Sequence, residues 1–100
     1  MSRRSTFEAD AESVQGNAGA TVTFRAVTVD EFKEYRETSM TDRELLASHV
    51  VAWKGIVDDN DQDMPSPADE PGIIGKLYLF ELQALARLLF AGPPAIPLPN

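Results

Sequence analysis

The sequence predicts a mainly α-helical fold, in which a small three-helix domain follows a short β-strand and a flexible N-terminal arm. Two residue pairs have the spacing of a capping box, in which each side chain satisfies a backbone donor at a helix start. These pairs are Thr28 with Glu31 and Thr41 with Glu44. The apolar stretch of residues 71–90 predicts a third helix. The length of 100 residues suits a single domain.

Composition divides the chain into an arm (residues 1–19), a single mainly helical domain (residues 20–92) and a proline-rich tail (residues 93–100). The arm is polar and rich in small residues, with Phe7 as its only large anchor, so we expect it to be flexible. The prolines of the tail predict an extended, solvated end.

The first regular element is a β-strand over residues 20–27. Val22 and Phe24 alternate there with polar residues, which is the period of a half-buried strand. Because a strand needs a pairing neighbour, either the segment around Phe7 or the same strand of another subunit must supply one. The sequence leaves both possibilities open.

Two helices follow in close succession. The first is predicted over residues 28–38, with an aromatic face formed by Phe32 and Tyr35 turned toward the core. The second is predicted from Thr41 to about Lys54, because its apolar residues recur with helical period. A strand over residues 49–57 is the alternative, since this segment is rich in β-branched residues. The helix is preferred because the capping signal and the period agree.

The segment of residues 58–70 holds six acidic residues, no basic residue and two prolines, and is predicted to be a loop. Four of its acidic side chains occupy positions 1, 3, 5 and 12 of a calcium-loop pattern. These are Asp59, Asp61, Asp63 and Glu70. However, Met64 stands where that loop requires glycine, and neighbouring prolines constrain the backbone. A solvated acidic connection is therefore the preferred interpretation, with calcium binding as the alternative.

The third helix is apolar nearly all the way round, apart from Glu81 and a narrow stripe formed by Lys76, Gln83 and Arg87. Domains of this size bury only about 60 to 65% of the surface of their unfolded chain. The helix is thus either the central helix of a small bundle or a surface for self-association or for a partner helix. The second interpretation is favoured, and a homo-oligomer is expected. The predicted partner-binding residues are Trp53, Leu77, Phe80, Leu82, Leu85, Leu89 and Phe90.

For Trp53 itself, the preferred interpretation is the largest core residue, packing on the last helix, and the interface role is the alternative. His49 is the only imidazole, and it shares a predicted helix face with leucines rather than with a nucleophile. It is therefore interpreted as a core or interface residue. We predict no catalytic residue, no enzyme activity and no cofactor.

The 16 acidic and 9 basic residues give a net charge of -7, which disfavours nucleic acid and anionic membrane as partners. Without cysteine, neither a disulfide framework nor a thiolate metal site can form. No apolar secretory signal follows Arg3 and Arg4, and charged residues interrupt the last helix too often for it to span a bilayer. These features predict a cytoplasmic protein.

Two segments, residues 22–32 and residues 46–59, resemble the tail assembly chaperones of long-tailed bacteriophages. The most similar stretch is Val50-Val51-Ala52-Trp53-Lys54-Gly55-Ile56-Val57, followed by Asp58, Asp59, Asn60 and Asp61. Members of this family are small acidic proteins with a strand-like start, a tryptophan segment, an acidic turn and a helical end. The present chain departs from that pattern at residues 62–67, where the family has a glycine and a proline-phenylalanine pair.

The resemblance implies a non-enzymatic role in the bacterial host cell. The protein would coat the hydrophobic, helical tape-measure protein during tail assembly and then yield it to the tail tube protein. It also implies that a longer form arises by ribosomal frameshifting. Two alternatives remain: a structural virion or connector subunit, and an acidic calcium-binding module.

Overall fold

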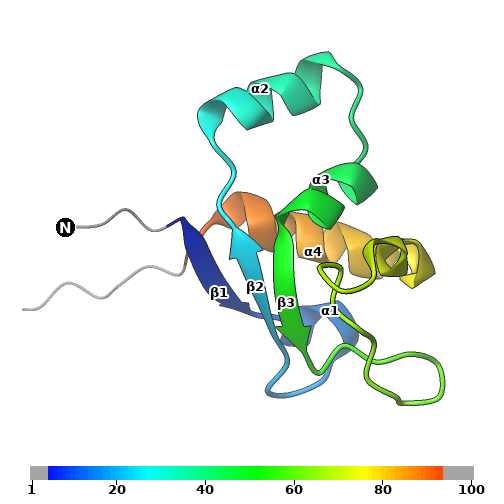
Figure 1. Ribbon diagram of the computed structural model, residues 1–100. Helices are drawn as coiled ribbons and strands as arrows, with labels where there is room; N and C mark the ends of the chain where they lie inside the picture. Colours follow the sequence, from blue (N-terminus) through cyan, green and yellow to red (C-terminus); the bar gives the residue numbers. More distant parts are fainter. Residues whose placement is uncertain (1–4, 94–100) are drawn as a thin grey trace, which may run out of the picture.

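The computed structural model describes residues 5–93 (Figure 1). Residues 94–100 of the predicted tail and the first four residues of the predicted arm lie outside this range. The elements are β1 (Thr6–Asp10), α1 (Glu12–Gln15), β2 (Thr21–Arg25), α2 (Val29–Glu37), α3 (Asp42–His49), β3 (Val50–Lys54), the 3-10 helix η1 (Pro71–Lys76) and α4 (Leu79–Ala91).

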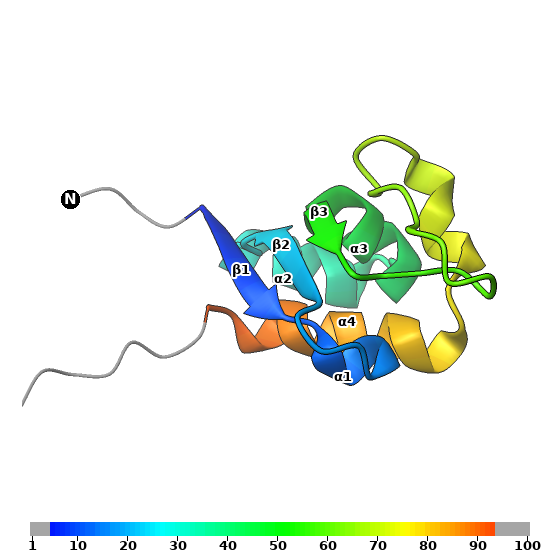
Figure 2. The ribbon, with the colours of Figure 1, turned by 90° about the horizontal axis from the view of Figure 1, so that it is seen from below.

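The prediction of a mainly α-helical fold is wrong. The chain forms a small α/β domain, in which an antiparallel sheet of order β1-β2-β3 packs with helices. In Figure 1, α4 runs behind the sheet, while α2 stands apart above it. Figure 2 gives a second view, in which α1 lies beside α4. The core combines residues from the sheet with residues of α1, α3, η1 and α4.

Much of the predicted flexible arm is ordered as β1 and α1, which is a second correction. Along β1, Phe7 and Ala9 are buried while the residues between them are exposed. Phe7 lies opposite Phe24 of β2, with ring centroids 5.4 Å apart. The neighbour of the predicted strand is therefore the segment around Phe7 of the same chain.

The strand predicted over residues 20–27 is confirmed as β2, where Val22 and Phe24 are fully buried. The first predicted helix is confirmed as α2 with its capping box. The Thr28 hydroxyl accepts a hydrogen bond from the Glu31 amide at 3.1 Å, and the Glu31 carboxylate accepts one from the Thr28 amide at 3.0 Å. The expected aromatic face is confirmed only in part: no residue of α2 is fully buried, Tyr35 packs against the core, and Phe32 stays exposed.

The second predicted helix begins as expected, since the Thr41 hydroxyl accepts a hydrogen bond from the Glu44 amide at 3.2 Å. It ends at His49 instead of continuing to Lys54, and the next five residues form β3. The alternative interpretation as a strand is correct for these residues. The physical reason is non-local, because β2 offers a free edge to which this β-branched segment pairs.

Gly55 ends β3 with a φ of 75°, a left-handed conformation that favours glycine. A Cβ atom at this position would lie 3.0 Å from both Cα and Cβ of Ala20. The backbone at Gly55, where the chain leaves β3, therefore packs tightly against Ala20, the residue before β2.

The predicted continuous helix of residues 71–90 is divided into η1 and α4, with Leu77 and Tyr78 in extended conformation between them. The amide of Tyr78 donates a hydrogen bond of 2.7 Å to the carboxylate of Glu81, which marks a new helix start. Because of this break, η1 directs Ile73 and Ile74 into the core while α4 contributes Leu85. Two separate helices, rather than one continuous helix, thus bury the apolar residues of this stretch.

Within residues 5–93, none of the helices combines the length and the hydrophobicity that crossing a lipid bilayer requires.

Candidate interaction surfaces

The predicted partner-binding residues do not form one surface. Leu85 and Leu89 are buried in the core. Leu77 and Leu82 are partly buried and pack against it. Phe80 and Phe90, near opposite ends of α4, are exposed. The middle of α4 is thus covered by the protein itself, and its two ends are left accessible.

Trp53 is partly buried and packs against the core, which was its preferred interpretation. It lies on β3 opposite Val22. Its indole N–H donates a hydrogen bond of 2.9 Å to the carbonyl oxygen of Met64. Trp53 therefore fastens the acidic loop to the sheet.

The first exposed surface is the α4 N-terminal patch, formed by Tyr78, Leu79 and Phe80. Their exposed fractions are 54%, 70% and 65%. The rings of Tyr78 and Phe80 stack with centroids 5.9 Å apart and planes 11° apart. Sequence reasoning included Phe80 and missed its two neighbours, because it did not detect the helix break that turns them outward.

An open groove of about 850 Å³ lies beside this patch. Its walls come from α1 and the following turn (residues 13–17), the acidic loop and the segment from η1 to α4. Four aspartates line it, Asp58, Asp59, Asp61 and Asp63, with Lys76 as its one basic lining residue.

The rim of this groove is joined to its acidic wall. The phenol of Tyr78 donates a hydrogen bond of 2.8 Å to the Asp59 carboxylate. This hydrogen bond, followed by the negative charge of Asp59, raises the pKa of Tyr78 above its usual value. Tyr78 therefore stays a neutral donor at physiological pH, and it orients the carboxylate of the loop.

The groove also contains a buried carboxylate, that of Glu81, which is held by Gln15. The Gln15 amide donates hydrogen bonds of 2.6 Å to Glu81 and 2.9 Å to the carbonyl oxygen of Val57. The Gln15 carbonyl oxygen accepts one of 3.0 Å from the Val57 amide. Since Glu81 also caps α4, its oxygens are occupied by structural partners. This network joins α1, the loop after β3 and α4.

The four residues of the alternative calcium-loop interpretation, Asp59, Asp61, Asp63 and Glu70, do not form a metal-binding cluster in the described part of the chain. Asp59 is bound by Tyr78, and Glu70 lies at the start of η1. Across the part of the chain that the structure describes, no three or more His, Cys, Asp or Glu side chains are placed to hold a metal ion. The loop instead caps itself, since the Asp58 carboxylate accepts hydrogen bonds from the amides of Asn60 and Gln62.

The second exposed surface is the α2 face, formed by Val29 and Phe32 of α2 and Phe90 of α4, with the partly buried ring of Tyr35 beside Phe32 and Phe90. The ring of Phe90, which is 43% exposed, lies 5.6 Å from that of Phe32 and 5.7 Å from that of Tyr35. Val29 is 86% exposed. The Tyr35 hydroxyl donates to Asp42, and this hydrogen bond raises the pKa of Tyr35.

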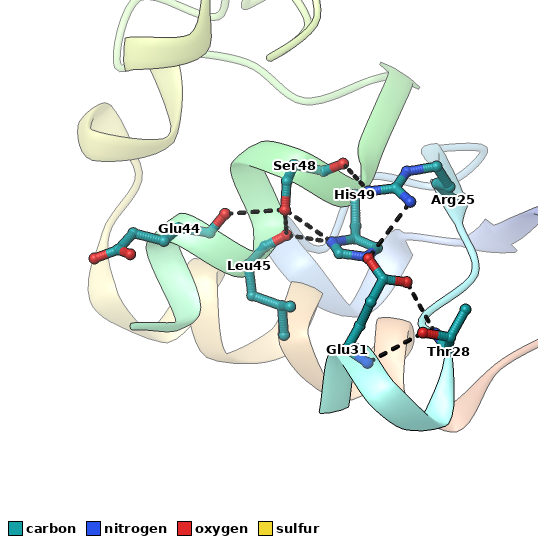
Figure 3. A network of polar contacts seen from close by, with 7 residues as sticks. All are labelled: Arg25, Thr28, Glu31, Glu44, Leu45, Ser48 and His49. Atoms are coloured by element: carbon teal, nitrogen blue, oxygen red, sulfur yellow. Dashed lines mark hydrogen bonds and ion pairs between the residues drawn. The ribbon is translucent and has the colours of Figure 1, made fainter. Parts of the chain in front are cut away.

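His49, predicted to be a core or interface residue, is buried where α2 meets α3 (Figure 3). Its Nδ1 lies 2.8 Å from the carbonyl oxygen of Leu45 and 2.9 Å from Oγ of Ser48. Its Nε2 lies 3.1 Å from the Glu31 carboxylate. The two ring nitrogens thus face a backbone carbonyl oxygen of α3 on one side and the Glu31 carboxylate of α2 on the other.

The side chain of His49, on α3, thus lies in contact with that of Ser48, on the same helix, and with that of Glu31, on α2. The Ser48 hydroxyl is nevertheless not positioned as a nucleophile. The Ser48 hydroxyl lies 3.2 Å and 3.0 Å from the carbonyl oxygens of Glu44 and Leu45, one and the same helix turn. Such back-bonding is usual for serine in helices. The arrangement therefore anchors α2 to α3.

Glu31 is the centre of this anchor. It pairs with buried His49 and with Arg25 at 3.5 Å. The hydrogen bond from the Thr28 amide, followed by the charge of His49, lowers the pKa of Glu31. Its carboxylate therefore stays ionised and ties the exposed helix α2 to the body.

Comparisons of the chain with known protein families, curated proteins and solved structures found no match. The resemblance to tail assembly chaperones rests on two sequence segments. The first covers β2 and the start of α2, and the second covers the end of α3, β3 and the start of the acidic loop. These segments contain most of β2, all of β3, and Asp58 and Asp59 of the acidic wall of the groove.

Proposed function

We propose that the protein is a non-enzymatic phage tail assembly chaperone, which binds apolar helical segments of the tape-measure protein. The observation that carries the proposal is the α4 N-terminal patch. Three consecutive large side chains stay more than half exposed on a domain that buries Leu45, Leu46, Leu85 and Leu89. Contiguous exposed apolar surface on a small domain commonly marks a site for another protein.

The charge of the chain supports the same role. A net charge of -7 keeps a protein with exposed aromatic rings soluble and opposes its self-aggregation. The patches are small and lie apart, so each contact with a client is weak. Weak contacts allow the client to be released when tube subunits compete for it.

The proposal is tested by co-expression with the tape-measure protein of the same phage. We expect the chain to increase the soluble fraction of the tape-measure protein, and the double variant Leu79→Ser and Phe80→Ser to lose most of this effect. Both side chains are exposed, so the variant should fold. Leu89 is unsuitable for such a test, because a polar residue at this buried position would unfold the domain.

The matched control is Val51→Ser, which removes an exposed apolar side chain from β3. It should leave the rescue unchanged. Equal solubility with and without the chain would refute the proposal. Retention of the chain in purified particles would favour the alternative of a structural virion subunit.

A further inference from the structure

The groove beside the α4 N-terminal patch joins two kinds of surface. One side is the acidic loop, with four aspartates, and the other is the stacked pair of Tyr78 and Phe80. The largely buried side chains of Val14 and Ile73 also line the groove. An occupant must therefore present apolar and cationic groups side by side.

Lysine and arginine side chains meet this requirement individually. Their aliphatic stems cover apolar surface while the charged head remains at a polar edge. A cation is also attracted to the face of an aromatic ring. In the groove, the same cation would reach the carboxylate of Asp59, which Tyr78 already orients at 2.8 Å. A carboxylate-bearing helix would meet repulsion at this wall.

We propose that the groove binds a basic amphipathic helix, with its apolar side on the α4 N-terminal patch and its lysine or arginine residues against the acidic loop. This inference rests on the proposed function and specifies the chemistry of the client segment. Residues four apart on a helix share one face, so leucines and lysines in alternating turns present both groups to the groove. Its volume of about 850 Å³ accommodates the side chains of a few turns.

Charge also argues against a second copy of this chain as the occupant. Each copy carries a net charge of -7, and the groove itself is acidic. Pairing two such surfaces would bring like charges together, which is unfavourable. A basic helix, in contrast, gains from the same field as it approaches.

The probe is a fluorescein-labelled synthetic helix of roughly 18 leucine and lysine residues in amphipathic order. Its anisotropy is titrated with the full chain. Two peptides of the same length serve as comparisons, one with the same composition in scrambled order and one with glutamate in place of lysine. We expect the amphipathic basic peptide to bind most tightly, with an affinity that falls as salt is added.

Two groove variants, Phe80→Ser and the pair Asp59→Asn with Asp61→Asn, should each weaken this binding by roughly tenfold. Asparagine preserves the hydrogen bond to Tyr78 and tolerates the positive φ of Asp61. The control pair, Glu34→Gln with Glu37→Gln, removes two exposed charges from α2 and should retain affinity. Unchanged urea midpoints will show that all variants are folded.

Equal weakening by the groove and control pairs would overturn the proposal, as would equal binding of the scrambled peptide, because either result indicates net charge alone. A concentration-dependent dimer that Phe80→Ser abolishes would identify a second copy as the occupant instead. If the tape-measure protein is rescued while the basic peptide does not bind, the groove proposal fails and the proposed function stands. If the peptide binds as expected but the tape-measure protein is not rescued, the groove proposal stands and the proposed function fails.

Discussion

At the residue scale, the contact between Glu31 and His49 decides how α2 is held. Glu31 belongs to α2, a helix with no buried residue, whereas His49 at the end of α3 is buried. A buried polar group without its partner is costly, so the pair acts as a latch whose strength depends on the charge of Glu31.

Replacing Glu31 by glutamine should lower the free energy of unfolding by about 1–2 kcal/mol at about pH 6, since the shape is kept and the charge is lost. The pKa of Glu31 in the folded protein lies below its ordinary value of 4.5. Its contribution is therefore present above that value and is lost as the pH falls through the lowered pKa. Urea denaturation of both proteins over this range measures the difference.

The control for this experiment is Glu34→Gln, on the same helix. The difference in unfolding free energy between this variant and the wild type should not change over the same pH range. A difference between wild type and Glu31→Gln that remains constant into the acid range would contradict the role of the carboxylate charge.

Gln15 is a second residue on which several elements depend. Alanine at this position removes hydrogen bonds to Glu81 and to both backbone groups of Val57. Because Glu81 is buried, we expect a loss of about 2–4 kcal/mol in unfolding free energy. Ser13→Ala, an exposed change in the same short helix, should cost little. Similar urea midpoints for the two variants would show that the network is dispensable.

At the scale of elements, α2 should be the first to open. It is fixed through the Glu31 latch, the Tyr35–Asp42 hydrogen bond and the rings around Phe90, while α3 and α4 contribute directly to the core. Helices with few buried contacts open at lower free energy than the global unfolding free energy. Hydrogen exchange measured by mass spectrometry should therefore show faster exchange in α2 than in α3, and Phe90→Ala should accelerate α2 selectively. Uniform protection would contradict this expectation.

Elements with local signals could be predicted from the sequence. The alternation in β2 and the capping residues Thr28 and Thr41 depend only on near neighbours, and all three signals gave the observed starts. β1 could not be found in this way, because a five-residue strand with two buried side chains has little pattern of its own. Its stability comes from pairing with β2, which follows it in the chain only after α1.

The change from α3 to β3 shows the same limit. Residues 45–53 fit a helical period, yet their second half pairs with β2, and this long-range contact overrides the local preference. The candidate surfaces could not be predicted for a related reason. The stretch that looks like one apolar helix breaks at Leu77 and Tyr78, and the sequence does not reveal this break. Hydrophobicity alone therefore could not separate buried Leu85 from exposed Phe80.

At the scale of the whole molecule, stability and partner binding occupy different parts of α4. Its middle closes the core against the sheet and α3, and its ends carry the exposed rings. A chain of 100 residues has little apolar surface to spare, so leaving large side chains exposed lowers the stabilisation available to the fold. This division allows the two roles to be separated by substitution.

Leu85→Ala should lower the free energy of unfolding by about 2–5 kcal/mol, because it leaves a cavity at a fully buried position. Phe80→Ser should change it by less than about 0.5 kcal/mol, since this ring is mostly in water. Client binding per folded molecule should show the reverse order, with Leu85→Ala close to wild type and Phe80→Ser weakened. Urea denaturation and a pull-down of the tape-measure protein, performed where every variant is folded, measure the two quantities.

The control is Gln83→Ala, at an exposed position on the same helix, which should change neither the unfolding free energy nor client binding. A loss of stability in Phe80→Ser as large as that in Leu85→Ala would show that the ring belongs to the core, and the exposed end of α4 could then no longer serve as the site that holds a client.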